Sequence, residues 1–363
     1  MRAVILADEF FATRERSLLQ RLEIGLADEG VRIVHAVPET VPAADDEGMF
    51  RTRATYPTRT LSLLRRASIA RLARSLARAG ANAGPEGEPI DLVHVFGGSV
   101  WRLGADLATA LGAALVLEVW RAGLVTRARE LTHVPQRTLL LAPDPAIERA
   151  LVAGAEGREV RGAPWGVLAE PTMRPILPAG RAVSAMIVGP GRDAAAMASV
   201  IEGLTPVVRA HPDLMIFCDA HAARRSGIWA VARRHDLLHN LSLIDDLEAR
   251  RDLLLQGDLL IQPDANGEAR SVVLEAMGCG MIVVAAADPA ASVLIDGRTA
   301  RLVSSGTPAE WGATILDVLR TPERSRMLAA SAHEFIRTQR RASDQVRAVL
   351  QAYAALVASP AGA

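Results

Sequence analysis

Short apolar runs alternate with amphipathic helical patterns from one end of the chain to the other. In the first half, the runs that we expect to form buried strands are residues 3–7, 31–37, 92–96, 114–119 and 138–142. Between the first two runs, leucines recur at helical spacing from Leu18 to Leu26, and Gly30 supplies a helix C-terminus. Buried strands separated by amphipathic helices indicate βαβ units and a parallel sheet.

The alternation stops at residues 170–178, where Pro171, Pro175 and Pro178 fall close together. Proline continues neither a helix nor a central strand, so residues 171–180 are predicted to form an extended linker. After the linker, strands are expected at residues 183–188, 214–218, 241–244, 259–262, 282–285 and 300–303. A last amphipathic helix is predicted at about residues 343–357.

This pattern predicts an α/β protein with two Rossmann-like, doubly wound domains, residues 1–170 and residues 181–342. Two such domains joined by a hinge form a cleft, and the ligands of open parallel sheets bind beyond the carboxyl ends of the strands. The cleft is therefore the expected ligand site. Residues 41–60 are polar and turn-rich, and residues 80–89 are rich in Gly and Pro, so both are predicted as loops.

All 41 basic residues are arginine, and they are balanced by 41 acidic residues. A general nucleic-acid binder needs a basic surplus, so no nucleic-acid partner is expected. The sequence has no lysine. This excludes a pyridoxal Schiff base, a lysine-dependent aldolase and a Walker-type phosphate loop, because each of them needs an ε-amine.

The sequence predicts neither a metal site nor a membrane span. Cys218 and Cys279 are the only cysteines and form no ligand cluster, so a structural zinc site and a disulfide framework are not expected. His235 and His239 stand at helical spacing but lack an acidic third ligand. No apolar run reaches the ~18 residues of a membrane span, and the N-terminus lacks the pattern of a signal peptide. A cytoplasmic protein is the expectation.

Residues 258–287 carry the densest group of chemically informative residues. A strand ends at Pro263, a polar turn follows, and a helix is predicted at about residues 270–278. The free amides and the positive end of the dipole at such a helix start bind anions. Glu275 lies one turn inside the helix, where it can accept hydrogen bonds from sugar hydroxyls, and Glu268 lies in the loop. The segment predicts a nucleoside diphosphate site with two carboxylates; the alternative is an ordinary βα unit with solvated acids.

The same segment resembles the C-terminal signature of the family 4 (group 1) glycosyltransferases of GT-B fold. That signature is an apolar strand, Pro-Ser, E-G-x-x-x-x-x-x-E, A-M-A-x-G and a second apolar strand. The matching stretches are residues 259–263 (LLIQP), 274–277 (LEAM), 278–280 (GCG) and 282–284 (IVV). Further similarity lies at residues 163–167, 188–189, 294–297 and 300–303. The resemblance implies a GT-B fold whose last helix returns to the N-terminal domain.

The resemblance also implies which residues bind the donor. Glu275 matches the second Glu of the motif, which holds the ribose of the nucleotide. The first Glu, which contacts the donor sugar, should stand at position 267; Gly267 is found there, and Glu268 beside it is the candidate for the role. The backbone of the neighbouring residues would cap the pyrophosphate, and the residues implied are Ala269, Arg270, Ser271 and Val272.

Two arginines are candidates for neutralising the diphosphate leaving group. The family usually has an Arg and a Lys after the first strand of the C-terminal domain, where this chain has Gly189, Gly191 and then Arg192. Arg192 takes the place of the Arg. Since lysine is absent, Arg270 is the candidate for the second cation, and a solvated arginine at the helix start is the alternative. The predicted catalytic residues are Glu268, Arg192 and Arg270.

The N-terminal half departs further from the family pattern. Phe10 and Phe11 stand where the family often has a glycine-rich turn, and they could stack on a sugar or anchor a loop. His94 is the first residue of the family's H-x-H, whose second His is replaced, and Glu118 stands in place of a Thr. These four residues are the candidates for the acceptor side of the cleft. A purely structural role is the alternative for each of them.

Residues 51–78 contain eight arginines and no acidic residue. Leu61, Leu64, Ile69, Leu72 and Leu76 fall on one helical face, so the stretch is predicted to be a basic amphipathic helix. Such a helix can contact an anionic membrane surface or an acidic acceptor. The alternative is a helix that packs on the sheet and exposes its basic face to solvent.

The leading hypothesis is a glycosyltransferase that moves a sugar from a nucleoside diphosphate sugar to an unknown acceptor (a glycan, a lipid or a small molecule). By resemblance the transfer would retain the anomeric configuration, and it would need neither a metal nor another cofactor. The second hypothesis is a GT-B nucleotide-binding or scaffold protein that has lost catalysis, because the first Glu is shifted and a Lys and a His are missing. A GT-B epimerase is the third.

Overall fold

The computed structural model describes the chain except residues 43–50, 59–64, 80–86, 155–156 and 359–363. The chain divides into two compact units. Unit 1 comprises Met1–Trp165 together with Ala342–Ala363, and unit 2 comprises Gly166–Arg341. Each unit is a parallel β-sheet with helices between its strands, so the predicted α/β class is confirmed.

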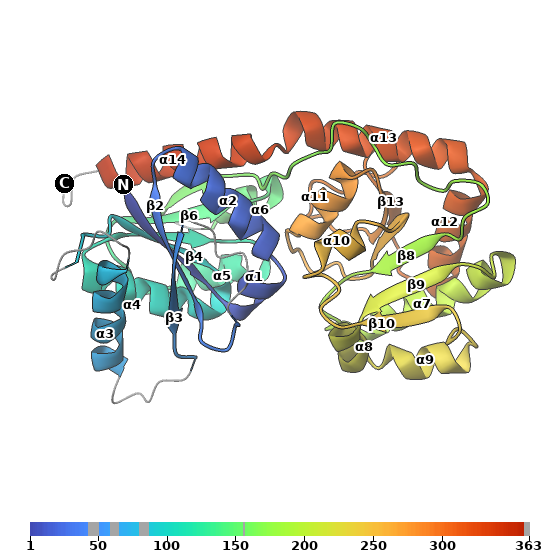
Figure 1. Ribbon diagram of the computed structural model, residues 1–363, viewed down its shortest axis with the longest axis horizontal. Helices are drawn as coiled ribbons and strands as arrows, with labels where there is room; N and C mark the ends of the chain where they lie inside the picture. Colours follow the sequence, from blue (N-terminus) through green and yellow to red (C-terminus); the bar gives the residue numbers. More distant parts are fainter. Residues whose placement is uncertain (43–50, 59–64, 80–86, 155–156, 359–363) are drawn as a thin grey trace. The chain divides into compact units, whose positions relative to one another are not determined.

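Unit 1 contains a seven-stranded parallel sheet in the order β3-β2-β1-β4-β5-β6-β7 (Figure 1). The central strand β1 pairs with both β2 and β4, so that Val4 lies beside Val34 on one side and Val93 on the other. Every residue of β1 is buried, as the apolar run predicts. The strands are β1 (Arg2–Ala7), β2 (Arg32–Pro38), β3 (Arg51–Tyr56), β4 (Leu92–Phe96), β5 (Ala114–Glu118), β6 (Thr138–Ala142) and β7 (Glu159–Gly162).

The last helix of the chain, α14 (Ala342–Ala358), belongs to unit 1, as the family resemblance implies. It packs on α2, where a Cβ atom on Gly25 would lie 2.5 Å from a methyl carbon of Val346. Glycine is therefore required at position 25 for the two helices to approach. The other helices of unit 1 are α1 (Glu9–Thr13), α2 (Arg16–Asp28), α3 (Arg65–Arg78), η2 (Gly98–Val100), α4 (Trp101–Leu111), α5 (Gly123–Glu130) and α6 (Pro145–Val152).

Unit 2 contains a six-stranded parallel sheet in the order β10-β9-β8-β11-β12-β13. Its strands are β8 (Ser184–Ile187), β9 (Met215–Asp219), β10 (Leu241–Ile244), β11 (Leu259–Gln262), β12 (Ile282–Ala286) and β13 (Arg301–Val303). Its helices are α7 (Ala194–Ala210), α8 (Ala220–Ser226), α9 (Ile228–Arg234), α10 (Arg251–Leu254), α11 (Ser271–Gly278), α12 (Pro308–Arg320) and α13 (Pro322–Gln339).

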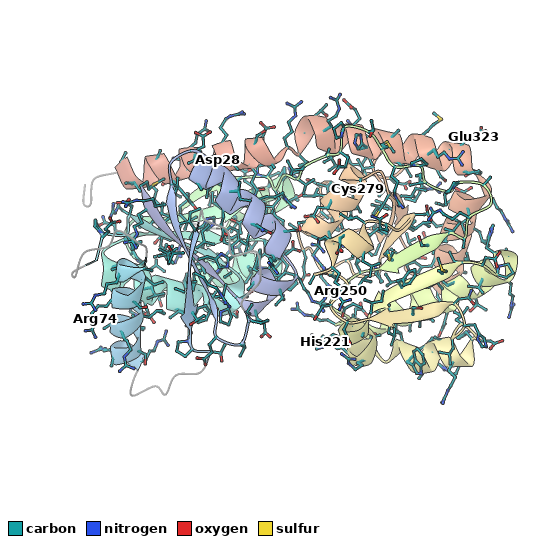
Figure 2. The ribbon with its side chains drawn as sticks, viewed as in Figure 1. Asp28, Arg74, His221, Arg250, Cys279 and Glu323 are labelled. Atoms are coloured by element: carbon teal, nitrogen blue, oxygen red, sulfur yellow. The ribbon has the colours of Figure 1, made fainter. Side chains whose placement is uncertain are left out.

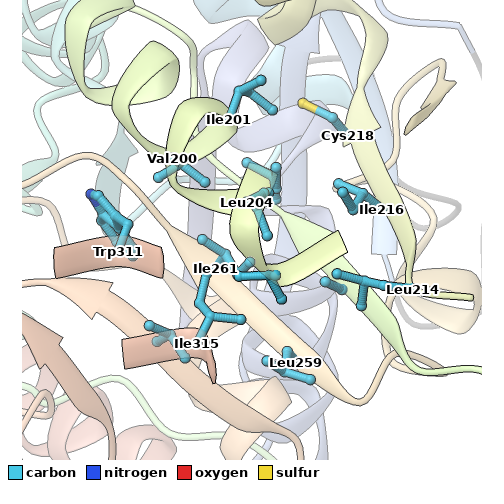
Figure 3. Packing of buried hydrophobic residues seen from close by; sticks show 14 of the residues in the cluster. Val200, Ile201, Leu204, Leu214, Ile216, Cys218, Leu259, Ile261, Trp311 and Ile315 are labelled. Atoms are coloured by element: carbon cyan, nitrogen blue, oxygen red, sulfur yellow. The ribbon is translucent and has the colours of Figure 1, made fainter. Parts of the chain in front are cut away.

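Figure 3 shows how the core of unit 2 is built on one face of this sheet. Leu204 of α7 and Ile315 of α12 pack with Ile261 of β11 in one cluster of buried residues. Trp311 of α12 is also buried in this cluster. The apolar faces of two helices thus cover the strand that leads into the predicted donor-binding segment.

Two edge strands, β3 and β7, were not predicted. β3 (RTRATY) lies in the segment predicted as the loop 41–60, and the same segment was expected to begin a basic helix. Both expectations are wrong for residues 51–56. An edge strand has a neighbour on one side only, and this one alternates Arg with smaller residues instead of forming an apolar run. Residues 43–50 and most of the predicted loop 80–89 lie outside the described residues.

The basic helix is shorter than predicted, because α3 begins at Arg65. Leu61 and Leu64 lie outside the described residues, whereas Leu72 and Leu76 are buried in unit 1. The arginines on the other side of the helix are exposed, among them Arg74, which is labelled in Figure 2. The apolar face is therefore occupied by packing, which favours the solvated basic face. In the described part of the chain, no helix is long and apolar enough to cross a membrane.

The proline-rich residues 171–178 belong to unit 2 and form neither a helix nor a strand. Ile176 and Leu177 are buried in the core of the unit. Arg326 of α13 donates hydrogen bonds to their carbonyl oxygens, over 3.2 Å to Ile176 and 2.6 Å to Leu177. The segment is thus fixed to the body of unit 2, and the division into units falls after Trp165.

Candidate functional site

The strand order of each sheet reverses at one point, and such a point is where open parallel sheets bind ligands. In unit 2 this point lies between β8 and β11, which are adjacent in the sheet although β9 and β10 lie between them in the chain. Gly189 follows β8 and Asp264 follows β11. A Cβ atom on Gly189 would lie 2.8 Å from Oδ2 of Asp264, and the φ angle of Gly189 is +135°. Only glycine fits this place.

Helix α11 begins beside this point, as the sequence pattern predicts. The chain leaves β11 at Gln262, forms a loop, and enters the helix at Ser271. Arg270 is the N-cap residue and its side chain makes no capping hydrogen bond. The side chain of the N-cap residue therefore does not occupy the space in front of the first turn, and the amides at such a helix start bind anions.

The three predicted catalytic residues lie together at the start of α11. Nη1 of Arg192 lies 3.3 Å from Oε1 of Glu268. Nη1 of Arg270 lies 3.9 Å from Oε2 of the same carboxylate. Glu268 and Arg270 are buried, whereas the side chain of Arg192 is 43% exposed. Residues 76 positions apart in the sequence thus form one charged cluster.

The loop geometry explains why the acid stands at position 268. Gly267 has a φ of +63°, which is the left-handed region that a glutamate adopts with strain. The amide of Gly267 donates to Oδ2 of Asp288 over 2.7 Å, which fixes the loop in this form. With glycine in the turn, the next residue, Glu268, supplies the carboxylate that contacts Arg192.

Glu248 belongs to this cluster and was missed by the sequence analysis. It is fully buried, forms an ion pair with Arg270, and accepts a hydrogen bond from the amide of Gly189 over 2.7 Å. Glu248 therefore holds in place both Gly189, at the point where the strand order reverses, and Arg270, the candidate for the second cation. It lies in the polar segment IDDLEARR, where nothing distinguishes it from a solvated turn residue.

Glu275 is buried rather than solvated. Its Oε2 accepts a hydrogen bond from Nε of Arg251 over 2.6 Å. Nη2 of Arg251 also lies 3.2 Å from Oγ of Ser271, the first residue of α11. Arg251, from the short helix α10, thus orients the carboxylate predicted to hold the ribose, and the sequence analysis missed it as well.

Asp264 is the second acidic residue of this region, after Glu248, that the sequence analysis missed. It is 3% exposed, and neither carboxylate oxygen has a hydrogen-bond partner in the part of the chain that the structure describes. Burial raises the pKa of this carboxyl to about 6, although the positive charge of Arg270 lowers it in part. The charges of Asp193, Glu268 and Glu248 raise the pKa further.

Unit 1 holds the two phenylalanines predicted for the acceptor side. The ring of Phe10 stacks on Trp120 at a centroid distance of 4.9 Å and is partly exposed. Phe11 is fully buried and contacts the rings of Phe96 and Trp165. Phe11 therefore anchors the loop, which was the alternative to ligand stacking, and Phe10 is the ring of this pair that reaches the surface.

His94 and Glu118 lie inside unit 1 in a buried polar network. Nδ1 of His94 is 2.7 Å from the hydroxyl of Tyr353, and Nε2 is 3.2 Å from Oε2 of Glu118. The indole of Trp165 donates to Oε1 of Glu118 over 2.6 Å. Because both side chains are buried and engaged, this geometry favours a structural role over contact with an acceptor.

The switch point of unit 1, between β1 and β4, lies beside a cavity. Asp8 follows β1, and its Oδ2 accepts a hydrogen bond from the hydroxyl of Ser99 over 2.8 Å. Burial raises the pKa of Asp8. Ser99 also lines a cavity of about 220 Å³, whose other lining residues are Tyr56, Pro57, Thr58, Arg65, Ser68, Ile69, Leu72, Val100 and Leu103.

Residues 184–321 match the family model described as "Glycosyl transferases group 1". No curated protein matches the sequence. Among solved structures, sucrose-phosphate synthase from Thermosynechococcus elongatus is similar at a TM-score of 0.72 and 15% identity, over 99% of this chain and 100% of that chain. HepE of Anabaena, in complex with UDP and glucose, is similar at a TM-score of 0.72 and 14% identity, over 98% and 99%.

A third similar structure is WaaG, a glycosyltransferase involved in lipopolysaccharide biosynthesis, with a TM-score of 0.62 and 14% identity over 99% of this chain and 100% of that chain. At these identities the structures establish the fold, and the matching family model lies within unit 2. The predicted fold and family resemblance are thereby confirmed. The chain has the GT-B fold throughout and carries the sequence pattern of the group 1 glycosyltransferases in residues 184–321.

Proposed function

We propose that this protein transfers a sugar from a nucleoside diphosphate sugar, and that unit 2 binds this donor at the carboxyl ends of β8 and β11. The observation that carries the proposal is the cluster of Arg192, Glu268 and Arg270 beside the start of α11. It combines two cations, the backbone amides of a helix start and a carboxylate. These are the groups that a departing diphosphate and a sugar require.

The two arginines have different roles in this proposal. Arg270 is buried and held by Glu248, so it provides a fixed positive charge. Arg192 is partly exposed, and its pair with Glu268 is of the kind that contributes at most about 1 kcal/mol. A diphosphate carries more charge than one carboxylate and binds a guanidinium bidentately. Arg192 therefore turns from Glu268 to the diphosphate when the donor binds.

This exchange of partners releases Glu268 for the donor sugar. A carboxylate accepts hydrogen bonds from hydroxyl groups, so Glu268 then positions the sugar at its reacting end. Gly189 and Gly191 let the loop after β8 pack closely against Asp264 and Ala222. The backbone amides of Arg270, Ser271 and Val272 cap the diphosphate. Glu275, oriented by Arg251, binds the ribose hydroxyls.

In the chemical step, the bond between the anomeric carbon and the diphosphate oxygen breaks, and the hydroxyl oxygen of the acceptor bonds to the anomeric carbon. The proton of that hydroxyl group passes to the departing diphosphate. The negative charge that develops on the diphosphate oxygen is stabilised by Arg192, Arg270 and the amides of Ser271 and Val272. Because arginines supply this charge, we propose transfer without a metal or cofactor. The retaining outcome follows from the family resemblance.

The acceptor is proposed to bind to unit 1 at the cavity lined by Tyr56 and Ser99. The lining combines hydroxyl groups, aliphatic side chains and the cation of Arg65. A molecule that carries a hydroxyl group, an apolar portion and a negative charge would fit this lining. Phe10 is the aromatic candidate on this side of the unit.

Calorimetry with UDP, GDP and ADP, followed by turnover assays with the corresponding sugar nucleotides, tests this function. Uridine nucleotides are the first choice, because the similar HepE was solved with UDP and with UDP-glucose. The expected result is micromolar binding of one diphosphate and hydrolysis or transfer of its sugar. Binding without turnover of any sugar nucleotide would contradict the transferase and leave a nucleotide-binding protein. No binding at all would contradict both.

A further inference from the structure

Asp264 differs from the glutamates near the point where the strand order of unit 2 reverses, because it forms no ion pair with an arginine within the described residues. Three glutamates there pair with three arginines, namely Glu268 with Arg192, Glu248 with Arg270 and Glu275 with Arg251. Asp264 is as buried as these glutamates, yet neither of its carboxylate oxygens makes a hydrogen bond within the described residues. Buried carboxylates without partners are rare, because desolvation disfavours them.

The carboxylate of Asp264 is also tightly packed against the backbone of Gly189. Asp264 lies two residues after the end of β11, and its Oδ2 occupies the space beside Gly189 that any larger residue would fill. Gly189 lies two residues after the end of β8, so the two residues follow the two strands between which the sheet order reverses. Position and lack of partners are independent observations, and both indicate that the carboxylate is kept for a ligand.

We propose that Asp264 binds a hydroxyl group of the sugar in the nucleoside diphosphate sugar, and so favours the sugar nucleotide over the free diphosphate. The inference rests on the proposed donor site. An ionised carboxylate only accepts hydrogen bonds and repels phosphate, so its partner must be a neutral donor group such as a sugar hydroxyl. Glu268, the carboxylate assigned to the same sugar, is one of the charged groups that act on Asp264.

Access to Asp264 is linked to the partner exchange of Arg192. Gly189 and Arg192 belong to one loop, and this loop covers Asp264 at Gly189. When Arg192 leaves Glu268 for the diphosphate, both carboxylates face the sugar. The free diphosphate gains nothing from Asp264, so the effect of this residue is confined to ligands that carry the sugar.

Calorimetry with matched ligands tests the proposal. The dissociation constants of UDP and UDP-glucose, and of the GDP and ADP counterparts, are measured for the wild type, Asp264→Asn and Asp264→Ala. A hydrogen bond to a charged group corresponds to about a 10- to 100-fold change in affinity. We expect both variants to bind the sugar nucleotide at least about 10-fold more weakly, relative to the diphosphate, than the wild type does. Their affinity for the diphosphate itself should be unchanged or improved. Asp245→Asn removes an exposed acid of the same unit and should leave the ratio unchanged.

Two results would overturn the inference alone. If the wild type binds both ligands and the Asp264 variants bind each of them as tightly as the wild type does, the carboxylate does not contact the sugar. If both ligands weaken equally, Asp264 is a structural residue. A wild type that binds none of the diphosphates would instead overturn the donor site and the inference with it. Asp264→Asn keeps the shape of the side chain, so near-UV circular dichroism separates a folded variant from a misfolded one.

Discussion

Replacing Asp264 by Asn should stabilise unit 2 at neutral pH, because the ionised carboxylate is buried without a partner. Burial raises its pKa from 3.8 to about 6. Since each pKa unit corresponds to about 1.4 kcal/mol, ionisation lowers the free energy of unfolding by about 3 kcal/mol above pH 6. The amide of the variant is itself buried, so part of this gain is offset. The dependence on pH is therefore the cleaner quantity.

The sign of the effect follows from which state releases its proton first. Below pH 3.8 the carboxyl is protonated in both states and imposes no penalty. Between pH 4 and 6 the unfolded chain ionises while the folded carboxyl stays protonated, so the free energy of unfolding of the wild type falls as pH rises. Asn does not titrate. The free energy of unfolding of the variant, relative to that of the wild type, should therefore rise by about 2.5 kcal/mol from pH 4 to pH 7.5. Above about pH 7.5 the difference should be constant.

Urea unfolding of the full chain between pH 4 and 8 measures this difference. Far-UV circular dichroism follows both units, and the fluorescence of the buried Trp311 contributes the signal of unit 2. If the units unfold separately, only the transition of unit 2 should move. The exposed Asp245→Asn serves as the control and should change stability by less than about 0.5 kcal/mol at every pH. A difference between Asp264→Asn and wild type that is independent of pH, or that falls as pH rises, would refute the reasoning.

Three further substitutions test the remaining contacts. Arg192→Ala should lower kcat by about 100-fold in turnover assays but change the urea midpoint little, because its ion pair is partly exposed; an unchanged kcat would remove Arg192 from catalysis. Glu248→Gln should destabilise the protein by about 3 kcal/mol in urea unfolding, since it removes the closer of the two carboxylates that pair with the buried Arg270, and a neutral effect would show that the pair does not hold the site. Glu275→Ala should weaken UDP binding about 10-fold in calorimetry, the loss of one charged hydrogen bond; unchanged affinity would contradict its role at the ribose.

The sequence predicted well the strands that have a neighbouring strand on each side, and it also predicted the bounds of the edge strand β10, whose residues 241–244 form a mostly apolar run. β4, β6 and β11 have the predicted bounds, because strands covered on both faces are continuous apolar runs. The edge strands β3 and β7 were missed for the opposite reason. Each of them has a neighbouring strand on one side only, so polar residues are tolerated there and the sequence contains no apolar run that would indicate a strand.

The same distinction applies to the site. Glu268 and Arg270 were found because they lie in one short segment with a recognisable order, and the structure brings Arg192 to them. Glu248 and Asp264 were not found, because what distinguishes them is burial against residues far away in the sequence. Glu248, for example, contacts Gly189 at a separation of 59 residues. No local pattern encodes such a contact.

The hydrogen bond between His94 and Tyr353 joins residues 259 positions apart and lies at the centre of unit 1. Unit 2 is a continuous stretch of chain, whereas unit 1 needs both ends. During synthesis on the ribosome, unit 2 can therefore complete its core before α14, which belongs to the core of unit 1, has been synthesised. The part of the protein made first is the part finished last. Until then, the surface of α2 at Gly25 that receives Val346 is uncovered, and transiently exposed apolar surface of this kind makes an incomplete chain prone to aggregation.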